Sequence, residues 1–180
     1  MSRLHAAIES GSVPDLITAI AAAGPGDIDE MDEVGRTPLV HAADTARQLM
    51  RTPFAEEFNP AFVPAQCHMV PLLCEAGADP NIPQRLAEDG TGVVKDDSSA
   101  LMHCLWGAEM RPLMPVLLAH GADPNYRRTY AEDDPDDCTA LDFIAGWTGH
   151  LEDVRLLLEA GCDVNSVPTF RGGTRDDMSA

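Results

Sequence analysis

Histidine and cysteine are the residues of this chain with the widest chemical reach, because both can bind transition metals and both can act in catalysis. The histidines are His5, His41, His68, His103, His120 and His150, and the cysteines are Cys67, Cys74, Cys104, Cys138 and Cys162. They do not combine with one another or with aspartate at the spacing of a zinc site or a redox pair. The adjacent residues His103 and Cys104 would diverge on a helix. These positions predict no metal site, no cofactor and no enzymatic activity.

Two further stretches carry part of a ligand-binding motif. Residues 90–92 read Gly-Thr-Gly, but no helix pattern follows them as a phosphate-binding loop requires. The acidic run at 132–137 could attract calcium, yet it lacks the ligand spacing of a calcium loop. We therefore expect neither site, and we expect most cysteines to be free thiols that fill small apolar positions.

The charge balance bears on the class of partner. The chain has 30 acidic and 12 basic side chains, a formal net charge of −18. This charge would repel the phosphates of nucleic acids, whereas it would attract a basic protein and accelerate its association. The alternative is that the charge only keeps the chain soluble. The positions of the carboxylates must decide between these two interpretations.

A repeat defines the elements that position these residues. Three stretches have similar sequences: LLCEAGADPN at 72–81, LLAHGADPN at 117–125 and LLEAGCDVN at 157–165. In each, an apolar helical pattern ends at a glycine, which can adopt the left-handed conformation that closes a helix. The Asp and Asn that follow favour turns. Each stretch therefore predicts a helix, a stop and an extended turn.

Each unit also has a recognisable beginning. Thr37, Ser99 and Thr139 precede short apolar segments, and a hydroxyl there can cap the first backbone N–H groups of a helix. Thr37 is followed by a proline, which loses no hydrogen bond at the first helical position. We expect a short first helix after each of these residues and then a second helix with the paired leucines. Residues 4–10 and about 14–23 are expected to form a similar pair at the N-terminus.

The order of these motifs resembles the ankyrin repeat. The resemblance rests on Gly35-Arg36-Thr37-Pro38-Leu39, on Ala42-Ala43, and on Leu72-Leu73 followed by Gly77-Ala78-Asp79-Pro80-Asn81. It implies an all-α fold: an ankyrin-repeat solenoid of four helix-pair units with long inserted loops. It also implies that projecting loops, here called fingers, bind a protein partner together with the concave face beside them. We place this domain at residues 1–168 and a flexible C-terminal tail at 169–180.

An insertion enlarges the second unit. From its first threonine to its closing asparagine this unit spans 45 residues, against 27 in the fourth, and the excess lies around residues 46–64. Phe54, Phe58 and Phe62 recur there at four-residue intervals, but nearby prolines limit any helix to a turn or two. We favour a role for these phenylalanines in pinning the insertion to the solenoid over direct contact with a ligand.

Two local expectations concern the third unit. A longer loop precedes it, and residues 93–95 could return from that loop as a short strand. Pro112 and Pro115 are both expected in the first turn of its second helix, where proline is tolerated.

The three fingers concentrate the carboxylates, holding 14 of the 30. The members are Asp27, Asp29, Glu30, Asp32 and Glu33, then Glu88, Asp89, Asp96 and Asp97, and finally Glu132, Asp133, Asp134, Asp136 and Asp137. Like charges on one edge repel each other, which favours a neutralising partner over the alternative that loops simply collect solvated carboxylates. Our partner-binding candidates among them are Asp29, Asp32, Glu33, Asp133, Asp134, Asp136 and Asp137.

Trp106 and Trp147 complete the candidate set. Each lies near the end of the first helix of its unit, a stretch that the resemblance places beside the concave groove. Aromatic anchors surrounded by polar groups are typical of protein interfaces. Packing against an insertion explains the two tryptophans equally well.

The function predicted from these features is a protein-interaction module. We expect a cytoplasmic location, because no apolar run approaches the roughly 18 residues of a membrane span and no secretory pattern follows Met1. The preferred hypothesis is an acidic inhibitor or immunity-type protein that blocks a basic protein such as a nuclease-like toxin. The alternative is a generic scaffold or adaptor subunit with no inhibitory role. Neither nucleic acid nor membrane is an expected partner, and the oligomeric state is left open.

Overall fold

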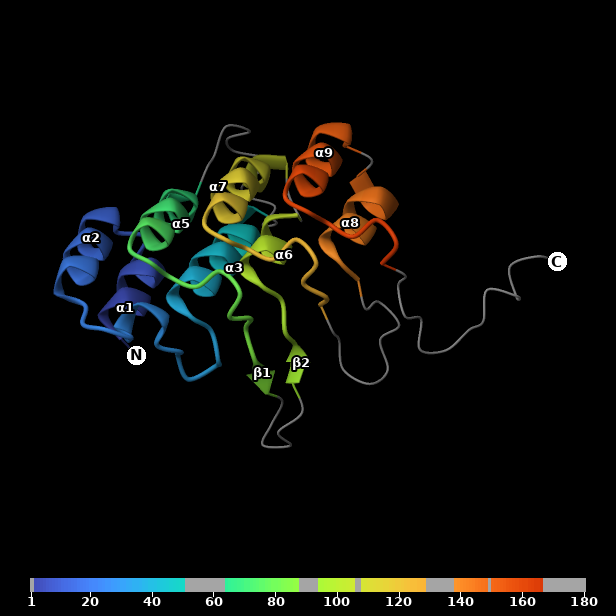
Figure 1. Cartoon of the computed structure of the whole chain (residues 1–180). Helices are drawn as coiled ribbons and strands as arrows, with labels where there is room; N and C mark the ends of the chain where they lie inside the picture. The colour runs from blue at the N-terminus through green and yellow to red at the C-terminus, as the bar shows by residue number, and fades with distance from the viewer. Residues whose placement is uncertain are drawn as a thin grey trace.

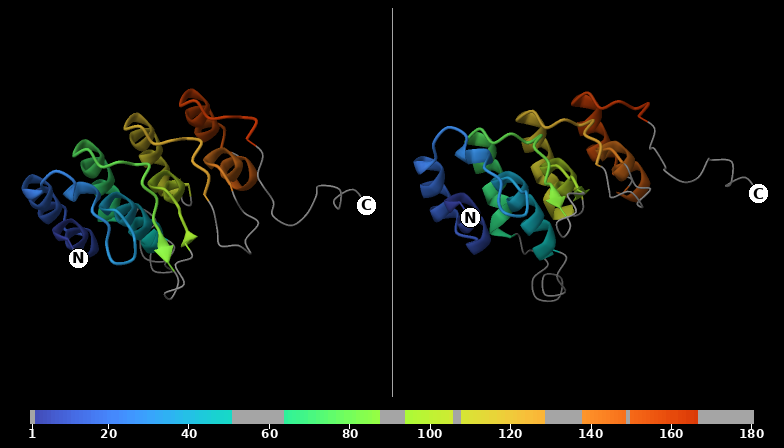
Figure 2. Two further views of the ribbon diagram at one scale, coloured as in Figure 1. Left: turned by 60° about the horizontal axis from the view of Figure 1, so that its bottom comes forward. Right: turned by 90° about the horizontal axis from the view of Figure 1, so that it is seen from below.

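Paired helices follow one another along a line in the computed structural model, which describes residues 2–50, 64–87, 94–105, 108–128, 138–148 and 150–166 (Figure 1). The pairs are α1 (Arg3–Ser10) with α2 (Val13–Ala22), α3 (Pro38–Met50) with α5 (Ala65–Glu75), α6 (Ala100–Cys104) with α7 (Met114–Ala119), and α8 (Ala140–Phe143) with α9 (Leu151–Glu159). Short 3-10 helices occupy Asp27–Asp29 and Ala108–Leu113, and a π-helical turn, Ile144–Thr148, continues α8. Figures 1 and 2 show two rows, one formed by the first helices of the pairs and one by the second helices.

The helices begin where the sequence predicts. The hydroxyls of Thr37, Ser99 and Thr139 each accept the backbone N–H of the residue three positions later, at 3.3–3.4 Å. At Thr139 the carboxylate of Asp142 also accepts the Thr139 N–H at 3.0 Å, which completes a capping box. Pro38 is the first residue of α3, as expected.

The helices of the second row end where the glycines predict. Gly77, Gly121 and Gly161 have φ of 88–89°, a left-handed conformation that a side chain would strain. The residue after each glycine donates its N–H, at 3.0 Å, to the carbonyl of the leucine four positions before the glycine. These three leucines are fully buried. The repeated sequence thus closes each helix and anchors it in the core with the same few residues.

One continuous apolar core runs through the pairs. Its largest fully buried side chains are Ile8, Leu16, Leu39, Met69, Leu73, Leu101, Met102, Met110, Met114, Leu117, Ile144 and Leu157. Ala42, Ala43 and Ala46 are also fully buried on α3. Small residues at these positions let α3 lie close to α1, α5 and α6, with which it packs.

Finger one, residues 24–36, and the following finger are joined at their bases. The Arg85 N–H donates to the carbonyl of Gly35 at 2.8 Å. Gly35 has φ of 78°, and a Cβ atom there would lie 2.4 Å from the Arg85 carbonyl oxygen, so only glycine fits. In finger two, between Asn81 and Ser99, β1 (Leu86–Ala87) pairs antiparallel with β2 (Val94–Asp96) and projects away from the helices (Figure 1). Finger three lies between Asn125 and Thr139, and its Tyr126 hydroxyl donates to the carbonyl of Asp97 in finger two.

The fold class is confirmed in its main feature, since helices dominate the described residues and the β hairpin is a small addition. The strand expected at 93–95 is present as Val94–Asp96, while residue 93 lies outside the described residues. Pro115 lies in the first turn of α7, but Pro112 lies in the preceding 3-10 helix, so the prediction for Pro112 is wrong. Because residues 108–113 form a 3-10 helix, α7 begins only at Met114, and Pro112 falls before its first turn.

The length predicted for α3 is also wrong. It has 13 residues and reaches Met50, inside the segment expected as an insertion. No glycine or proline interrupts it, and Asp44 accepts hydrogen bonds from Arg47 and Gln48 within its last turns. The predictions for Phe54, Phe58 and Phe62 and for the tail at 169–180 concern segments outside the described residues.

Candidate functional site

Side-chain hydrogen bonds along one edge of the molecule join each turn to the next. Asn81 accepts the backbone N–H of Asp123 at 2.7 Å and donates to the carbonyl of Gly121 at 2.9 Å. Asn125 binds the next turn in the same way, at 2.6 and 3.2 Å. We call this series the turn ladder. It sets the register of neighbouring units, because each rung recognises the backbone of the following turn.

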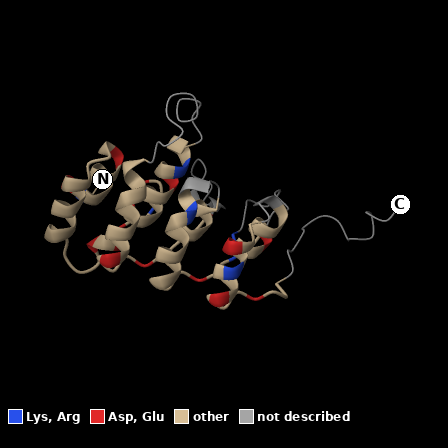
Figure 3. Cartoon of the chain, turned by 90° about the horizontal axis from the view of Figure 1, so that it is seen from above, with Lys and Arg blue, Asp and Glu red and all other residues tan. Residues whose placement is uncertain are grey.

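Exposed carboxylates follow the same edge. Asp79, Asp123 and Asp163 each use one oxygen to accept the N–H two residues later, at 2.8–2.9 Å, and are otherwise exposed. Glu75 and Glu159 are exposed at the ends of the adjoining helices. Figure 3 shows acidic residues at the turns along this edge. We name these five residues the acidic edge; none forms an ion pair with the residues that the structure describes.

The arginines nearest the core are used inside the molecule. Arg47 lies 2.6 Å from the buried carboxylate of Asp44, and Arg36 approaches the same carboxylate at 3.6 Å. Arg111 pairs with the buried Asp153 of α9 at 3.1 Å. Since these cations neutralise buried carboxylates, they do not compensate the acidic edge.

Asp32, a predicted partner-binding residue, is held by its own finger. One oxygen accepts the N–H groups of Val34 and Arg36, at 3.1 and 2.8 Å. The other accepts Nε of Arg36 at 3.0 Å and pairs with the same guanidinium at 2.9 Å. Burial acts to raise the pKa of Asp32, but the hydrogen bonds and the charge of Arg36 outweigh it and lower the pKa below 3.8. The side chain is only 7% exposed, so its charge serves the finger.

The other two candidates of finger one differ from each other. Asp29 forms the first rung of the turn ladder, accepting the Asp79 N–H at 3.0 Å. Burial raises the pKa of Asp29 above 3.8, although the hydrogen bond from Asp79 acts against it. Glu33 is exposed and forms no hydrogen bond or ion pair within the described part of the chain. Of the three, Glu33 is therefore the one fully available to a partner.

The remaining candidates are not described in the structure at side-chain level. Trp106 and the run Asp133, Asp134, Asp136 and Asp137 lie outside the described residues. Trp147 belongs to the π-helical turn, and its side chain lies outside the description. Their role in binding stays a prediction.

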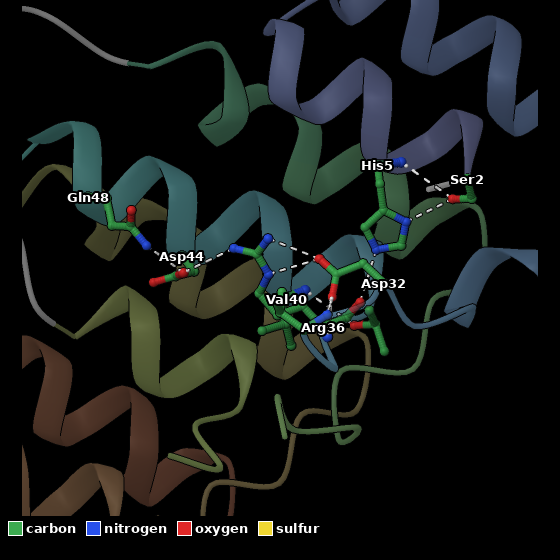
Figure 4. A network of polar contacts seen from close by, with 9 residues as sticks. Ser2, His5, Asp32, Arg36, Val40, Asp44 and Gln48 are labelled. Atoms are coloured by element: carbon green, nitrogen blue, oxygen red, sulfur yellow. Dashed lines mark hydrogen bonds and ion pairs between the residues drawn. The ribbon is translucent and has the colours of Figure 1, made fainter. Parts of the chain in front are cut away.

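Two buried histidines lie beside finger one. The rings of His5 and His41 stack with centroids 5.4 Å apart. Nε2 of His5 donates to the carbonyl of Arg36 at 2.9 Å, and Nδ1 lies 2.8 Å from the Ser2 hydroxyl (Figure 4). Burial lowers the pKa of His41 to about 4, with a further contribution from the positive charge of Arg36. A neutral His41 ring is therefore part of the folded state near pH 7.

These two histidines and Asp32 bring three potential metal ligands together. Potential ligand atoms of His5, Asp32 and His41 all lie within 4.8 Å of one another. Spacing in the sequence misses this group because α1, finger one and α3 each supply one member. Both nitrogens of His5 and both oxygens of Asp32 have partners within the chain. We therefore interpret the group as a structural network that ties the first two helix pairs together.

The cysteines of the core follow the prediction of buried free thiols. Cys67, Cys74 and Cys104 are buried and form no disulfide. Burial raises the pKa of Cys74 to about 11 and that of Cys104 further still. Thiols held in the protonated form are poor nucleophiles and poor metal ligands.

One comparison with known families bears on the repeated unit. A family model described as Ankyrin repeat matches residues 136–167. This segment is similar to an ankyrin repeat. It includes α8, α9 and the turn that closes at Asn165, so the predicted resemblance to the family is confirmed there. No curated protein matches the chain.

Ankyrin repeats generally act as protein-interaction modules rather than as enzymes. The turn of the matched segment recurs at residues 77–81 and 121–125 with the same glycine conformation and the same hydrogen bonds. Among the described residues, no helix has the length and apolar character needed to cross a membrane.

The acidic edge was not among the predicted site residues. Its signal was present, because an aspartate follows each helix-closing glycine at the same distance in all three copies. Sequence reasoning predicts that these aspartates form turns, and they do form the turns. Only the arrangement of the turns in space shows that their charges lie along one edge.

Proposed function

We propose that this chain is a solenoid of four ankyrin repeats that binds a basic protein, and that the acidic edge attracts this partner. Support for the repeats beyond residues 136–167 comes from recurring contacts. Hydroxyl caps begin the first helices of all four pairs, and left-handed glycines close the second helices of the last three pairs. One ladder of hydrogen bonds runs from turn to turn.

The observation that carries the proposed partner class is the uncompensated charge of the acidic edge. Five exposed carboxylates, spread over three successive units, form no ion pair with the described residues. Like charges held on a rigid edge produce a field that attracts a cationic surface and raises its rate of association. The same field repels phosphate polymers, so nucleic acid is disfavoured as a partner.

Finger one adds to this surface at its start. Asp29 places a carboxylate at the rung where the later units have asparagine, and Glu33 is exposed on the same finger. Asp32 is excluded from this surface, because its charge is neutralised by Arg36. We also predict that the acidic run at 133–137 and the two tryptophans belong to the proposed surface.

We further propose that the chain inhibits the basic protein that it binds. An anionic edge is attracted to the sites that bind phosphates in a nuclease-like protein, and occupying such a site would block it. The net charge of −18 and the acidic edge are what supports this form. A scaffold role is its competitor and uses the same surface.

A capture experiment tests the proposal. The full chain is immobilised, exposed to a lysate of the cells that make it, and eluted with salt from about 0.1 to about 1 M, a range over which surface charges become screened. We expect a basic protein to be retained at low salt and released at high salt. A neutral-edge variant, with Glu75→Gln, Asp79→Asn, Asp123→Asn, Glu159→Gln and Asp163→Asn, should not retain it.

The amides of this variant keep the oxygen that accepts each turn N–H, so the fold is preserved while the charge is removed. Glu9→Gln with Asp15→Asn, two exposed carboxylates of the first helix pair, is the control for charge alone. Equal retention by wild-type and neutral-edge chains would contradict the proposal. If the captured protein is an enzyme, loss of its activity in the complex supports inhibition, and full activity assigns a scaffold role.

A further inference from the structure

The last helix pair presents an apolar face at the end of the row. Leu151 and Leu158 of α9 are 79% and 44% exposed, and Val164 in the closing turn is 62% exposed. Leu151 and Leu158 are seven residues apart, which places them on one stripe of the helix. Figure 1 shows α8 and α9 at the end of the row opposite to α1 and α2. We call the surface of these three side chains the end face.

The same repeat positions are covered in the earlier units. Counting from the helix-closing glycine, Leu158 corresponds to Cys74, which is only 3% exposed, and to Leu118, which is partly buried. Val164 corresponds to Pro80 and Pro124, and both are buried. The next helix pair lies beside each of those units, whereas Ser166 is the last described residue after the final turn. The end face therefore has the shape and composition of a surface between units.

The turn ladder also indicates that a further unit can pack against the last one. Asn165 occupies the position of Asn81 and Asn125, and its backbone N–H donates to Asp163 at 2.9 Å, as in the earlier turns. The side-chain amide of Asn165 has no hydrogen-bond partner within the described part of the chain. This turn therefore already has the conformation in which Asn81 and Asn125 bind the following turn.

We propose that the end face binds a helix pair of another protein, whose second helix closes in a Gly-Xaa-Asp turn. Asn165 would accept the aspartate N–H of that turn and donate to its glycine carbonyl, as Asn125 does within the chain. The incoming helices would cover Leu158 and Val164. The proposal concerns the end of the solenoid and does not depend on the acidic edge.

The charges beside the end face specify the partner further. Glu152 and Arg155 lie 3.7 Å apart and are both mostly exposed, so this pair is weak. Glu159 and Asp163 are exposed and form no ion pair with described residues. The partner's helix should therefore carry lysine or arginine where it passes these two carboxylates.

A second copy of this chain does not fit the end face. In the first helix pair, α2 ends at Ala23 with φ of −70°, and the N–H of Gly24 is bound to the carboxylate of Asp27 at 2.8 Å. The left-handed glycine of that turn, Gly26, directly precedes Asp27, so the Gly-Xaa-Asp spacing is missing. The Asp27 N–H already donates to the carbonyl of Gly24 at 3.1 Å, so it is not free for Asn165. Two end faces placed against each other would juxtapose their carboxylates.

The first test uses a peptide of residues 138–166, which carries the required turn, as the probe. It is titrated into the isotopically labelled full chain and followed by NMR. We expect amide shifts around Leu158, Val164 and Asn165. Leu158→Glu in the full chain should weaken binding at least tenfold. Ile17→Glu, a similarly exposed residue (52%) in the first pair, should leave binding unchanged within twofold. A peptide with Gly161→Val should not bind, because valine does not adopt the left-handed turn.

A covalent form of the test does not depend on the folding of a short peptide. In a longer chain, a second copy of residues 126–165 follows Ser166. Asn165→Ala should lower the unfolding midpoint of the longer chain by several degrees, about 3 °C or more. The same change should leave the unfolding midpoint of the native chain unaffected, because the Asn165 side chain has no hydrogen bond to a following turn there. Asn125→Ala should lower the midpoint of both.

Three results would overturn the proposal. The first is equal sensitivity of both chains to Asn165→Ala, and the second is self-association of the native chain that Leu158→Glu abolishes. The third is peptide binding that appears only after residues 167–180 are removed, which would assign the face to the chain's own C-terminal segment. The neutral-edge variant retains Leu158 and Val164 and should still bind the peptide, so failure here is distinguishable from failure of the proposed function.

Discussion

Finger one and the acidic edge are both rich in carboxylates, yet the structure uses them in opposite ways. In finger one, the side chain of Asp32 is buried against Arg36. One of its oxygens accepts backbone N–H groups, and the other binds the Arg36 guanidinium. On the acidic edge, Asp123 uses one oxygen for its own turn and presents its charge to solvent. The comparison shows that the number of carboxylates in a segment does not measure the charge available to a partner. The available charge depends instead on whether a cation of the same chain pairs with the carboxylate.

The largest effect on stability is expected at Asp32. Asp32→Ala leaves Arg36 and two N–H groups without their acceptor, and should lower the free energy of unfolding by about 3–4 kcal/mol. Glu33→Ala, one residue along the same finger, should change it by less than about 0.5 kcal/mol. Chemical denaturation of the two variants measures both values. Similar values for the two would erase the distinction between structural and available carboxylates.

A second contrast compares glycines of the two regions. Gly35→Ala in finger one places a methyl group 2.4 Å from the Arg85 carbonyl at a positive φ, and should cost about 3 kcal/mol. Gly77→Ala on the edge has a positive φ but nothing within 4 Å, and should cost about 1 kcal/mol. Thermal unfolding of both variants tests whether the finger base is the more tightly packed region. A larger loss at Gly77 would reverse that conclusion.

The buried side of finger one should also make stability depend on pH. The pKa of His41 is about 4 in the folded chain and 6.5 as its ordinary value, so between these values the unfolded chain binds more protons. Stability from this group is complete above pH 6.5 and falls as the pH is lowered towards 4, by roughly 3 kcal/mol at most. Denaturation at a series of pH values should show the slope.

His41→Phe is the matched control, because the fourth helix pair has Phe143 at the equivalent position. This variant should lose the slope between pH 6.5 and 4 while keeping the acid loss below pH 3.8 that the lowered pKa of Asp32 predicts. An unchanged slope would assign the pH dependence to another group.

The smallest effect on stability is expected at the acidic edge. The neutral-edge variant keeps every turn hydrogen bond, so its free energy of unfolding should stay within about 0.5 kcal/mol of the wild type or rise slightly as repulsion is relieved. A loss of several kcal/mol would show that these charges serve the fold, like that of Asp32.

Much of this fold follows from local chemistry that the sequence displays. The hydroxyls of Thr37, Ser99 and Thr139 cap helices in the structure, and Gly77 closes one, because each acts on backbone within a few residues of itself. The role of Asp32 was harder to predict. Its four contacts depend on the conformation of finger one, and a carboxylate in a loop reads as solvated unless that conformation is known.

Contacts between elements account for the other differences. His5, Asp32 and His41 meet only when α1, finger one and α3 are in place, so spacing along the chain gives no sign of them. The extension of α3 to Met50 depends on helix-internal bonds to Asp44 that its buried position strengthens. The acidic edge exists as a surface only because the turn ladder aligns successive units.

The rate at which the basic partner associates with the wild-type and neutral-edge chains tests the central claim most directly. Stopped-flow mixing at about 50 mM salt should show association at least tenfold slower for the neutral-edge variant, and at about 1 M salt the two rates should converge. Equal rates for the two chains at low salt would contradict the account, because the exposed carboxylates would then have no part in attracting the partner.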